Sequence, residues 1–451
     1  MKILVWPTTF GSDLWSLSRY LDARPEVTLK VVMDHPEVYL REGVAELFPL
    51  RAQIIERRAH SHLLGAPGFR PDVTIIDNRV PLRATSPRGL VLWHGYGWKG
   101  PNDVVELAHL HASLKRAWGS AKRPNPRLRW QAFGQWDFDH RTTVSGIHPD
   151  NCRVLGAASH DDLRVPLDKG RVAHLYPFDV VGKQTVLIAP TWHYGEVFAH
   201  WGRDEELFEK LLSHLESRGA NVILRLHDSF RFEKPYQDFL RSLAARHEGL
   251  LLKFKDLSPD NFVDLQVADV LVTNFSSIAN LYYATRRPTV HVYPVADADE
   301  ELPWRHLTPL GMVKTTGRTA RFIWKLPPEE NGGLLARSFD EMMAQIDQSL
   351  DDPGCCARQV DDFLERHMLG ADGRCCERIW ETLVGSPEKE WGCKASIRIG
   401  NHHLAEKEMM KALGFLEKGV DHPTDLDAAM QCRMHLARHR FAMGKDSEAK
   451  S

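Results

Sequence analysis

A histidine and a lysine that could transfer a proton and bind a phosphate follow the apolar run Val91–Trp93. His94 and Gly95 come directly after this run, and Lys99 follows a few residues later. If the run forms a strand, these residues lie at the carboxyl end of a sheet, where α/β proteins hold ligands. An imidazole exchanges a proton near neutral pH, and an ammonium can bind a phosphate. The segment therefore predicts a general base beside an anion contact, although a strand-end histidine can also have a purely structural role.

Polar and aromatic side chains follow two later apolar runs in the same way. Thr191 and Trp192 come after Pro190, which ends a strand because it lacks an amide N–H. His227 leaves another run, and Arg225 lies two positions before it, so a regular strand places both on one face. We expect Thr191 and Trp192 to offer a hydroxyl and a ring to a ligand, His227 to face that ligand, and Arg225 to be a second phosphate contact.

A fourth segment combines a buried strand with two serines. Thr273 ends the run and Ser276 and Ser277 precede an apolar helical pattern. The first turn of a helix has unpaired N–H groups and the positive end of the helix dipole, to which serine hydroxyls add donors. We expect Thr273, Ser276 and Ser277 to hold phosphate without a metal. A Ser-Ser pair is also an ordinary helix cap, so this structural alternative stays open.

Several common sites are absent from the sequence. It has no P-loop, no G-x-G-x-x-G after the first strand and no H-E-x-x-H, so nucleotide-binding and zinc sites of those types are not expected. His60 and His62, and likewise His109 and His111, have H-x-H spacing but no strand-end position. The acidic run Asp297–Glu300 could hold Mg²⁺ but is read as a solvated loop. We therefore predict no metal and no cofactor.

Composition narrows the class of protein. Lys and Arg number 58 against 60 Asp and Glu, so bulk charge does not favour nucleic-acid binding. The 7 cysteines include no C-x-x-C, which is typical of reduced thiols in the cytoplasm. The N-terminus lacks a signal-peptide pattern, and no run approaches the roughly 20 apolar residues of a membrane helix. We expect a cytoplasmic protein that binds no nucleic acid.

Strands and helices alternate along most of the chain, which is the pattern of an α/β fold. In the first half we predict strands at Ile3–Trp6, Leu29–Met33, Val73–Ile76, Leu90–Trp93 and Arg153–Leu155. In the second half we predict strands at Thr185–Ala189, Val222–Leu226, Leu250–Phe254, Val270–Thr273 and Thr289–Tyr293. Helices fit between the later strands at Asp204–Ser217, Pro235–His247, Phe262–Val267 and Ile278–Thr285. This order predicts two doubly wound parallel-sheet domains that face each other across a cleft.

The strand pattern stops after about Pro327, and helices follow. They fit Ser338–Leu350, Ala357–Met368 and Gly373–Val384 and, beyond a polar break, His402–Lys418 and Asp425–Met443. We predict a first α/β domain over residues 1–170, a second over 171–384 and a helical extension over 385–451. The extension ends in a manner similar to a tetratricopeptide helix pair, but one copy does not establish a repeat.

Taken together, the motifs resemble those of the CDP-glycerol glycerophosphotransferases, the polymerases and primases of teichoic acids and related capsules. In chain order they are His94-Gly95-x-x-x-Lys99, Ala189-Pro190-Thr191-Trp192, Leu226-His227, Thr273-x-x-Ser276-Ser277, Arg287-Pro288-Thr289-Val290 and Asp372-Gly373. The resemblance implies the two-domain glycosyltransferase-B fold, with the acceptor side in the first domain and the nucleotide donor in the second. It also implies transfer of a polyol phosphate from a CDP-activated donor to an acceptor hydroxyl, with release of CMP.

The resemblance, together with the negative charge that develops on the phosphates during transfer, assigns roles to the candidate residues. We predict His94 as the base and His227, Ser276 and Ser277 as the groups that hold the phosphates and stabilise the leaving group. Gly95 and Lys99 would serve the acceptor side. The sequence departs from the family pattern at several positions: Asn274, Phe275, His193, Gly156–Asp161 and 326–333. These departures leave donors other than CDP-glycerol open, such as CDP-ribitol.

Two other functions stay open: a sugar-nucleotide glycosyltransferase of the same fold, and a non-catalytic polymer-binding or scaffold protein. The partners expected from the resemblance are the CDP-activated donor and a lipid-linked or polymeric acceptor. For contact with an anionic membrane at its inner face, the candidate is Leu114–Trp130, which has six cations, two tryptophans and no acidic residue. A solvated basic loop or a groove for an anionic acceptor would have the same composition.

Overall fold

The computed structural model describes most of residues 1–385. The gaps are residues 9, 42, 94, 102–106, 192–196, 199–200, 294–300, 303–304, 308–312 and 316–319. For residues 99–101, 108–109, 301–302, 305–307, 313–315 and 320–323 only the backbone is described. Residues 386–451, and with them the two helices predicted over 402–418 and 425–443, lie outside the described residues.

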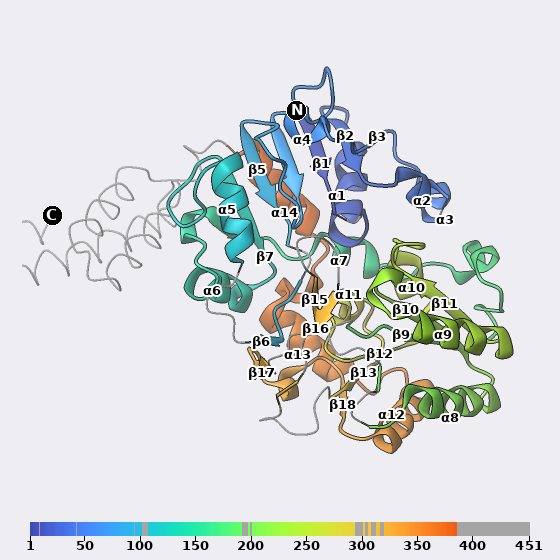
Figure 1. Cartoon of the computed structure of the whole chain (residues 1–451). Helices are drawn as coiled ribbons and strands as arrows, with labels where there is room; N and C mark the ends of the chain where they lie inside the picture. The colour runs from blue at the N-terminus through green and yellow to red at the C-terminus, as the bar shows by residue number, and fades with distance from the viewer. Residues whose placement is uncertain are drawn as a thin grey trace, which may run out of the picture.

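Seven parallel strands form the sheet of the first unit, in the order β3-β2-β1-β4-β5-β7-β8 (Figure 1). They are β1 Lys2–Trp6, β2 Thr28–Met33, β3 Gln53–Glu56, β4 Val73–Ile76, β5 Arg88–Val91, β7 Leu128–Ala132 and β8 Cys152–Val154. Five of these strands match predicted ones, and β3 and β7 were not predicted. β7 lies at the end of the basic stretch, where Arg129 alternates with the buried Leu128 and Trp130, an alternation typical of a strand that the sequence analysis missed.

Six parallel strands form the sheet of the second unit, in the order β11-β10-β9-β12-β13-β18. They are β9 Thr185–Ile188, β10 Asn221–Leu226, β11 Leu250–Phe254, β12 Val270–Thr273, β13 Thr289–Val292 and β18 Leu334–Ala336. The prediction that strands stop after Pro327 is wrong, because β18 extends the sheet beside β13. At three residues β18 is too short to produce a recognisable pattern.

Helices cover both sheets, and none of those in the described part of the chain is long and apolar enough to cross a bilayer. In the first unit they are α1 Ser12–Asp22, α2 Pro36–Leu40, α3 Gly43–Leu47, α4 Ser61–Leu64, α5 Ala108–Ala117, α6 Gln135–Thr143 and α7 Ala158–Leu163. The later ones are α8 Asp204–Ser217, α9 Lys234–Arg246, α10 Phe262–Val267, α11 Ile278–Tyr282, α12 Phe339–Asp351, α13 Ala357–His367 and α14 Cys375–Val384. The result is two doubly wound parallel-sheet units, as predicted.

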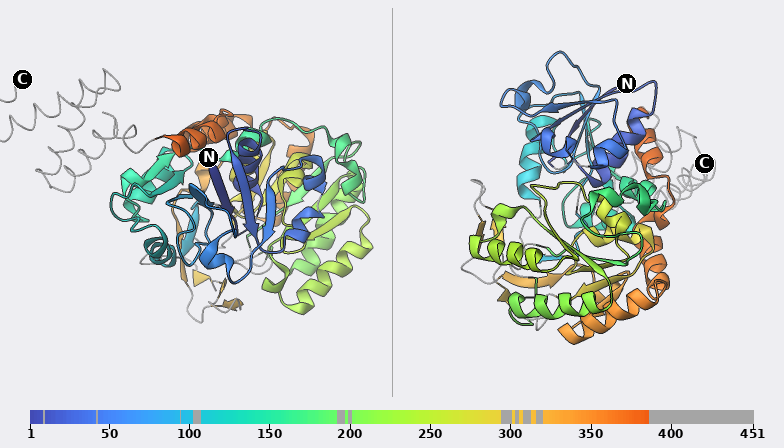
Figure 2. Two further views of the ribbon diagram at one scale, coloured as in Figure 1. Left: turned by 90° about the horizontal axis from the view of Figure 1, so that it is seen from above. Right: turned by 90° about the vertical axis from the view of Figure 1, so that its right-hand side faces the viewer.

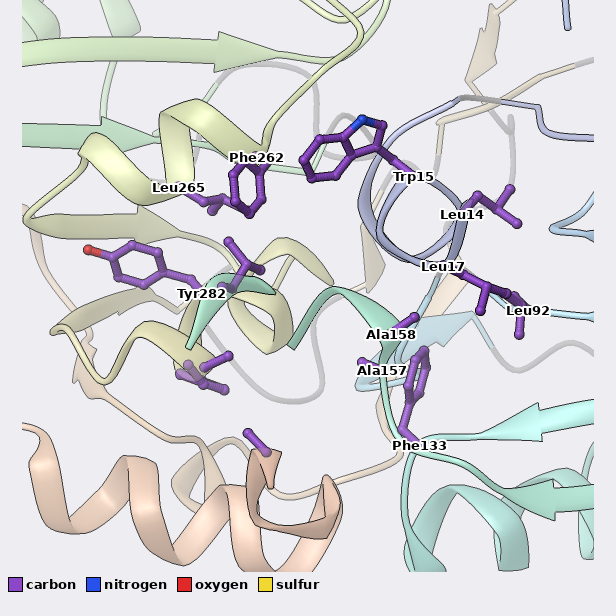
Figure 3. Packing of buried hydrophobic residues seen from close by; sticks show 14 of the residues in the cluster. Leu14, Trp15, Leu17, Leu92, Phe133, Ala157, Ala158, Phe262, Leu265 and Tyr282 are labelled. Carbon is purple, nitrogen blue, oxygen red and sulfur yellow. The ribbon is translucent and has the colours of Figure 1, made fainter. Parts of the chain in front are cut away.

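A single apolar core continues from one unit into the other. Trp15 of α1 packs against Phe262 of α10, with 4.8 Å between the ring centroids. Phe48 contacts the same Phe262 ring at 5.8 Å. Figure 3 shows Trp15 and Phe262 facing each other, with Ala158 of α7 and Tyr282 of α11 in the same cluster. Because a large apolar interface resists domain motion, this core fixes how the two units face each other.

The chain also crosses between the units at its C-terminal end. Helices α12 to α14 run along one side of the molecule from the second unit back to the first (Figure 2). Asp161 of α7 accepts hydrogen bonds from the backbone N–H groups of Cys375 and Cys376, at 3.0 and 2.7 Å, at the start of α14. The predicted second domain over 171–384 therefore includes a last helix that packs on α1 and α7 of the first unit.

A short strand from the first half of the chain pairs with a strand of the second unit. β6 Lys99–Pro101 pairs antiparallel with β17 Ala320–Trp324, which in turn pairs with β14 Glu301–Leu302. A separate two-stranded sheet joins β15 Arg305–Leu307 to β16 Val313–Thr315. The segment that follows β5 is thereby held against the second unit.

Candidate functional site

The strand order reverses at one point in each sheet, between β1 and β4 and between β9 and β12. Loops that leave the carboxyl ends of strands at such a reversal diverge and leave a crevice, which is where open α/β sheets bind ligands. In this chain both crevices open onto one cavity of about 220 Å³. Its walls come from the loops after β1, β4 and β5 and from those after β9, β10, β11 and β12.

His227 lines this cavity at the end of β10, as predicted from its position after a strand. Its Nδ1 lies 2.9 Å from Oδ2 of Asp228, which also accepts a hydrogen bond from Nε of Arg231 at 2.7 Å. Burial lowers the pKa of His227 to about 4, helped by the charges of Lys255 and Arg231 and opposed by the hydrogen bond with Asp228. The imidazole is therefore neutral at pH 7.

The carboxylate of Asp228 sets the orientation of this imidazole. Burial alone would raise its pKa, but the hydrogen bonds from His227 and Arg231 and the charge of Lys255 outweigh burial, so the pKa lies well below its ordinary value. An ionised carboxylate accepts hydrogen bonds and cannot donate them. The neutral His227 therefore carries its proton on Nδ1, and Nε2 is left as the proton-accepting nitrogen.

Arg225 lies in the same wall, but its guanidinium is engaged within the protein. Nη1 donates to Oδ2 of Asp264 at 2.9 Å, and Nη2 donates to the carbonyl of Ser258 at 2.6 Å. Asp264 also accepts hydrogen bonds from Lys253 Nζ and the Tyr176 hydroxyl, both at 2.7 Å. The predicted phosphate contact is thus a buried structural group that contributes positive charge to the wall.

Ser276 and Ser277 both line the cavity, which agrees with their predicted position. The helix that follows them, α11, has only five residues before a 3-10 turn, so its dipole is weaker than the prediction assumed. The Ser277 side chain makes no capping hydrogen bond with this helix. The structural alternative of an ordinary side-chain cap is therefore not what the fold shows, and the hydroxyls can serve a ligand.

Thr273 and Thr191 have structural roles in the same region. The Thr273 hydroxyl donates to the carbonyl of Ala189 at 2.7 Å and accepts from the backbone N–H of Ser276 at 3.3 Å. The backbone N–H of Thr191 donates to Oδ1 of Asn274 at 2.6 Å. These bonds join the loops after β9 and β12. Neither threonine is part of the cavity lining, so the structure supports only an indirect role for both.

Phe275 gives this turn its shape. Its φ of +60° lies in the left-handed region, which a bulky residue adopts only when packing enforces it. The ring packs against His291 at 4.4 Å, Trp324 at 4.7 Å and Trp98 at 5.6 Å between centroids. Filling this aromatic cluster aims the following serines at the cavity.

The segment predicted to carry the base is only partly described. His94 lies outside the described residues, as does Trp192, but Trp93 lines the cavity directly before His94. The Gly95 carbonyl accepts a hydrogen bond from Nη2 of Arg141 at 3.3 Å. The backbone of Lys99 pairs with β17 on the second unit, and its side chain is not described.

Further cavity residues were missed by the sequence analysis. Lys255 follows β11 directly, and Asp77 follows β4. Asp77 accepts hydrogen bonds from the backbone N–H of Thr8, at 2.9 Å, and from its hydroxyl, at 2.7 Å. The Ser12 hydroxyl donates to Oδ1 of Asn261 in the other unit at 3.1 Å. The rule that found His227, a polar residue directly after a strand, would also have found Lys255 and Asp77.

No cluster of metal-ligating side chains occurs among the residues that the structure describes. The acidic run Asp297–Glu300 lies outside them.

The basic stretch Leu114–Trp130 differs from its prediction in one respect. Trp118 and Trp130 are 1% and 0% exposed, and the Trp118 Nε1 donates to the Ser86 carbonyl at 3.1 Å. The expectation that the two tryptophans reach a membrane interface is wrong, because they are core residues. Most cations of the stretch do remain exposed: Lys115, Arg116, Lys122, Arg123 and Arg127.

Comparisons with known proteins agree with this architecture. Residues 168–300 match the family model described as CDP-glycerol:poly(glycerophosphate) glycerophosphotransferase. The teichoic acid ribitol-phosphate polymerase TarL of Staphylococcus aureus (strain NCTC 8325 / PS 47) is 24% identical over 208 residues, or 46% of this chain. The chain spans 32% of that relative's length.

Solved structures of the wall teichoic acid polymerase TagF share the fold. A histidine-to-alanine variant of TagF superposes with a TM-score of 0.59 at 12% identity, over 85% of this chain and 88% of the TagF chain. A TagF variant soaked with CDPG superposes with a TM-score of 0.56 at 13% identity, over 85% and 87% of the two chains. The fold is therefore of the glycosyltransferase-B type. The resemblance predicted from the motifs is confirmed, and the segment that carries His227, Ser276 and Ser277 has the signature of the CDP-glycerol glycerophosphotransferase family.

Proposed function

We propose that this chain transfers a polyol phosphate, with glycerol phosphate as the first choice, from a CDP-activated donor to an acceptor hydroxyl. The product would be a teichoic-acid-like or capsular polymer, and CMP would be released. One observation carries the proposal: His227, Ser276 and Ser277 line one cavity at the switch points of both sheets, inside the segment that matches the family. The soak of a TagF crystal with CDPG supports the class of donor.

The second unit would hold the diphosphate and the first unit the acceptor. The acceptor oxygen attacks the donor's β-phosphorus, and the bond from that phosphorus to the oxygen of CMP breaks. The acceptor's proton passes to a base, a role that we assign to His94. Ser276 and Ser277 would donate hydrogen bonds to the phosphate oxygens, whose negative charge grows in the transition state. Lys99 and Gly95 stay as proposed acceptor contacts.

His227 adds a feature that the resemblance alone does not supply. Its pKa is about 4, because burial and neighbouring cations disfavour the imidazolium. A diphosphate beside the ring would favour the imidazolium, since a nearby opposite charge stabilises the charged form. We expect donor binding to be accompanied by proton uptake, which would convert His227 into a donor to the phosphates. Calorimetry in buffers of different ionisation enthalpy measures this uptake, and the His227→Gln variant is its control.

Access to a lipid-linked acceptor would come from a surface at the far edge of the first sheet. The loop that carries the exposed cations precedes β7, so it lies at the amino ends of the strands and away from the cavity. This position disfavours an acceptor groove. Arg116 Nε donates to the Leu82 carbonyl at 3.0 Å, and Leu82 and Leu64 are 49% and 64% exposed. Exposed leucines beside exposed cations suit an anionic bilayer.

Vesicle sedimentation tests this surface. We expect anionic vesicles to bring down the protein at low salt, and reversal of the Arg116 and Lys115 charges to weaken binding. Equal sedimentation with neutral and anionic vesicles would remove the membrane role. It would leave the proposed transfer reaction untouched.

The reaction itself is tested with a panel of nucleotide-activated polyols and sugars and an assay for released nucleotide. We expect CMP release, with phosphate carried into the product. His94→Ala and His227→Ala should each lower turnover by at least about a hundredfold, as for other acid–base groups. A product that gains a sugar without phosphate would indicate a glycosyltransferase on the same fold. No transfer from any donor would indicate a binding protein.

A further inference from the structure

Lys255 is the cavity residue whose role neither the motifs nor the resemblance assigns. It follows β11, the edge strand beside β10, and its backbone N–H donates to the carbonyl of Leu226 at 3.1 Å. This bond places Lys255 next to His227. Its side chain lines the same cavity as His227, Ser276 and Ser277.

The Lys255 ammonium has charged neighbours but no hydrogen-bonded partner among the described residues. Arg225, the other cation of the wall, is engaged by Asp264, whereas the Lys255 ammonium makes no hydrogen bond with any residue that the structure describes. Its attractive charge partners are Asp228 on its own wall and Asp77 on the opposite wall, with Arg231 and Arg225 opposing. Burial lowers the pKa of this lysine.

Asp77 faces Lys255 across the cavity and attracts its ammonium through its charge. Its carboxylate accepts hydrogen bonds from the Thr8 backbone and hydroxyl and from the backbone N–H of Asn78, at 2.5 Å. It therefore shapes the loop after β1. A partly buried ammonium that lacks hydrogen-bond acceptors is costly, and an anionic ligand relieves that cost.

We propose that Lys255 binds the diphosphate of the activated donor, together with the hydroxyls of Ser276 and Ser277. This inference rests on the proposed function, because it takes a nucleoside diphosphate as the ligand. It assigns the direct cationic contact to Lys255 in place of Arg225, whose guanidinium is held by Asp264. A lysine suits this role because it is a compact point charge that binds phosphate without a fixed geometry.

The test compares CDP binding by calorimetry in the wild-type protein, Lys255→Met, Lys255→Gln and Lys255→Arg. We expect the two neutral variants to weaken CDP binding by about 10- to 100-fold, the range for a lost charge-assisted hydrogen bond. Lys255→Arg should retain part of the affinity. Lys183→Met, which removes an exposed cation outside the cavity, should bind CDP as the wild type does.

The outcomes separate this inference from the proposed function. Folded Lys255→Met and Lys255→Gln proteins that bind CDP within twofold of the wild type would overturn the role of Lys255. If the wild type binds CDP but transfers no polyol phosphate from any donor, only the proposed function falls. If it does not bind CDP at all, both fall.

Discussion

Stability should depend on pH through His227, because its pKa differs between the folded and unfolded chain. The folded value is about 4 and the ordinary value is 6.5. In this pH range the imidazole binds a proton more readily in the unfolded chain than in the folded one. The contribution of His227 to the free energy of unfolding is therefore complete above pH 6.5 and is lost as pH falls towards 4. The whole shift corresponds to about 3 kcal/mol, at 1.36 kcal/mol for each pH unit. Between pH 7 and pH 5 the expected loss is about 2 kcal/mol.

Between pH 7 and pH 5 the titration of His227 is separated from that of its neighbour Asp228. The pKa of Asp228 lies well below its ordinary value, so this carboxylate stays ionised throughout. Urea unfolding followed by tryptophan fluorescence at both pH values should show that the wild type loses about 2 kcal/mol more than His227→Gln. Asn261→Ala, which alters the same cavity without an ionisable group, is the control. A difference between wild type and His227→Gln that stays constant from pH 7 to pH 5 would refute the reasoning.

Three further outcomes are expected. Transfer activity should persist in a chelator, because side chains supply the positive charge. A loss of activity that Mg²⁺ or Mn²⁺ restores would instead make Asp297 and Asp299 the candidate metal ligands. The double variant Ser276→Ala with Ser277→Ala should lower kcat/KM for the donor about thirtyfold, at roughly 1 kcal/mol for each of the two hydrogen bonds lost, and an unchanged kcat/KM would exclude both hydroxyls. Trp15→Ala should destabilise the protein by about 3–5 kcal/mol and leave a single unfolding transition; two separate transitions would contradict a shared core.

The parts of the site that local sequence patterns determine were predictable. β10 and β12 are apolar runs with sharp ends, and the rule that ligands lie at strand ends located His227, Ser276 and Ser277. The role of Arg225 was not predictable in this way. Its side chain is on the expected face, but its partner Asp264 is 39 positions away and reaches it only in the folded protein.

Other features depend on contacts that no local pattern records. β6 becomes a strand only because β17 of the other unit pairs with it. The predicted role of the tryptophans in Leu114–Trp130 failed for a similar reason: Trp130 stacks on Trp93, and a composition count does not show which face of β7 is buried. Side-chain burial across strands had to come from the structure.

The return of α14 to the first unit limits how this protein can be divided into working fragments. A fragment that ends near residue 170 would leave the faces of α1 and α7 that α14 covers exposed to water, and Asp161 would lose both of its N–H donors. Separately expressed halves are therefore expected to aggregate or to require each other for solubility. Chimaeras that exchange the second unit between relatives should keep residues 357–385 from the parent that supplies the first unit. The segment to exchange is therefore the continuous stretch 171–356, and the retained first unit consists of two segments, 1–170 and 357–385.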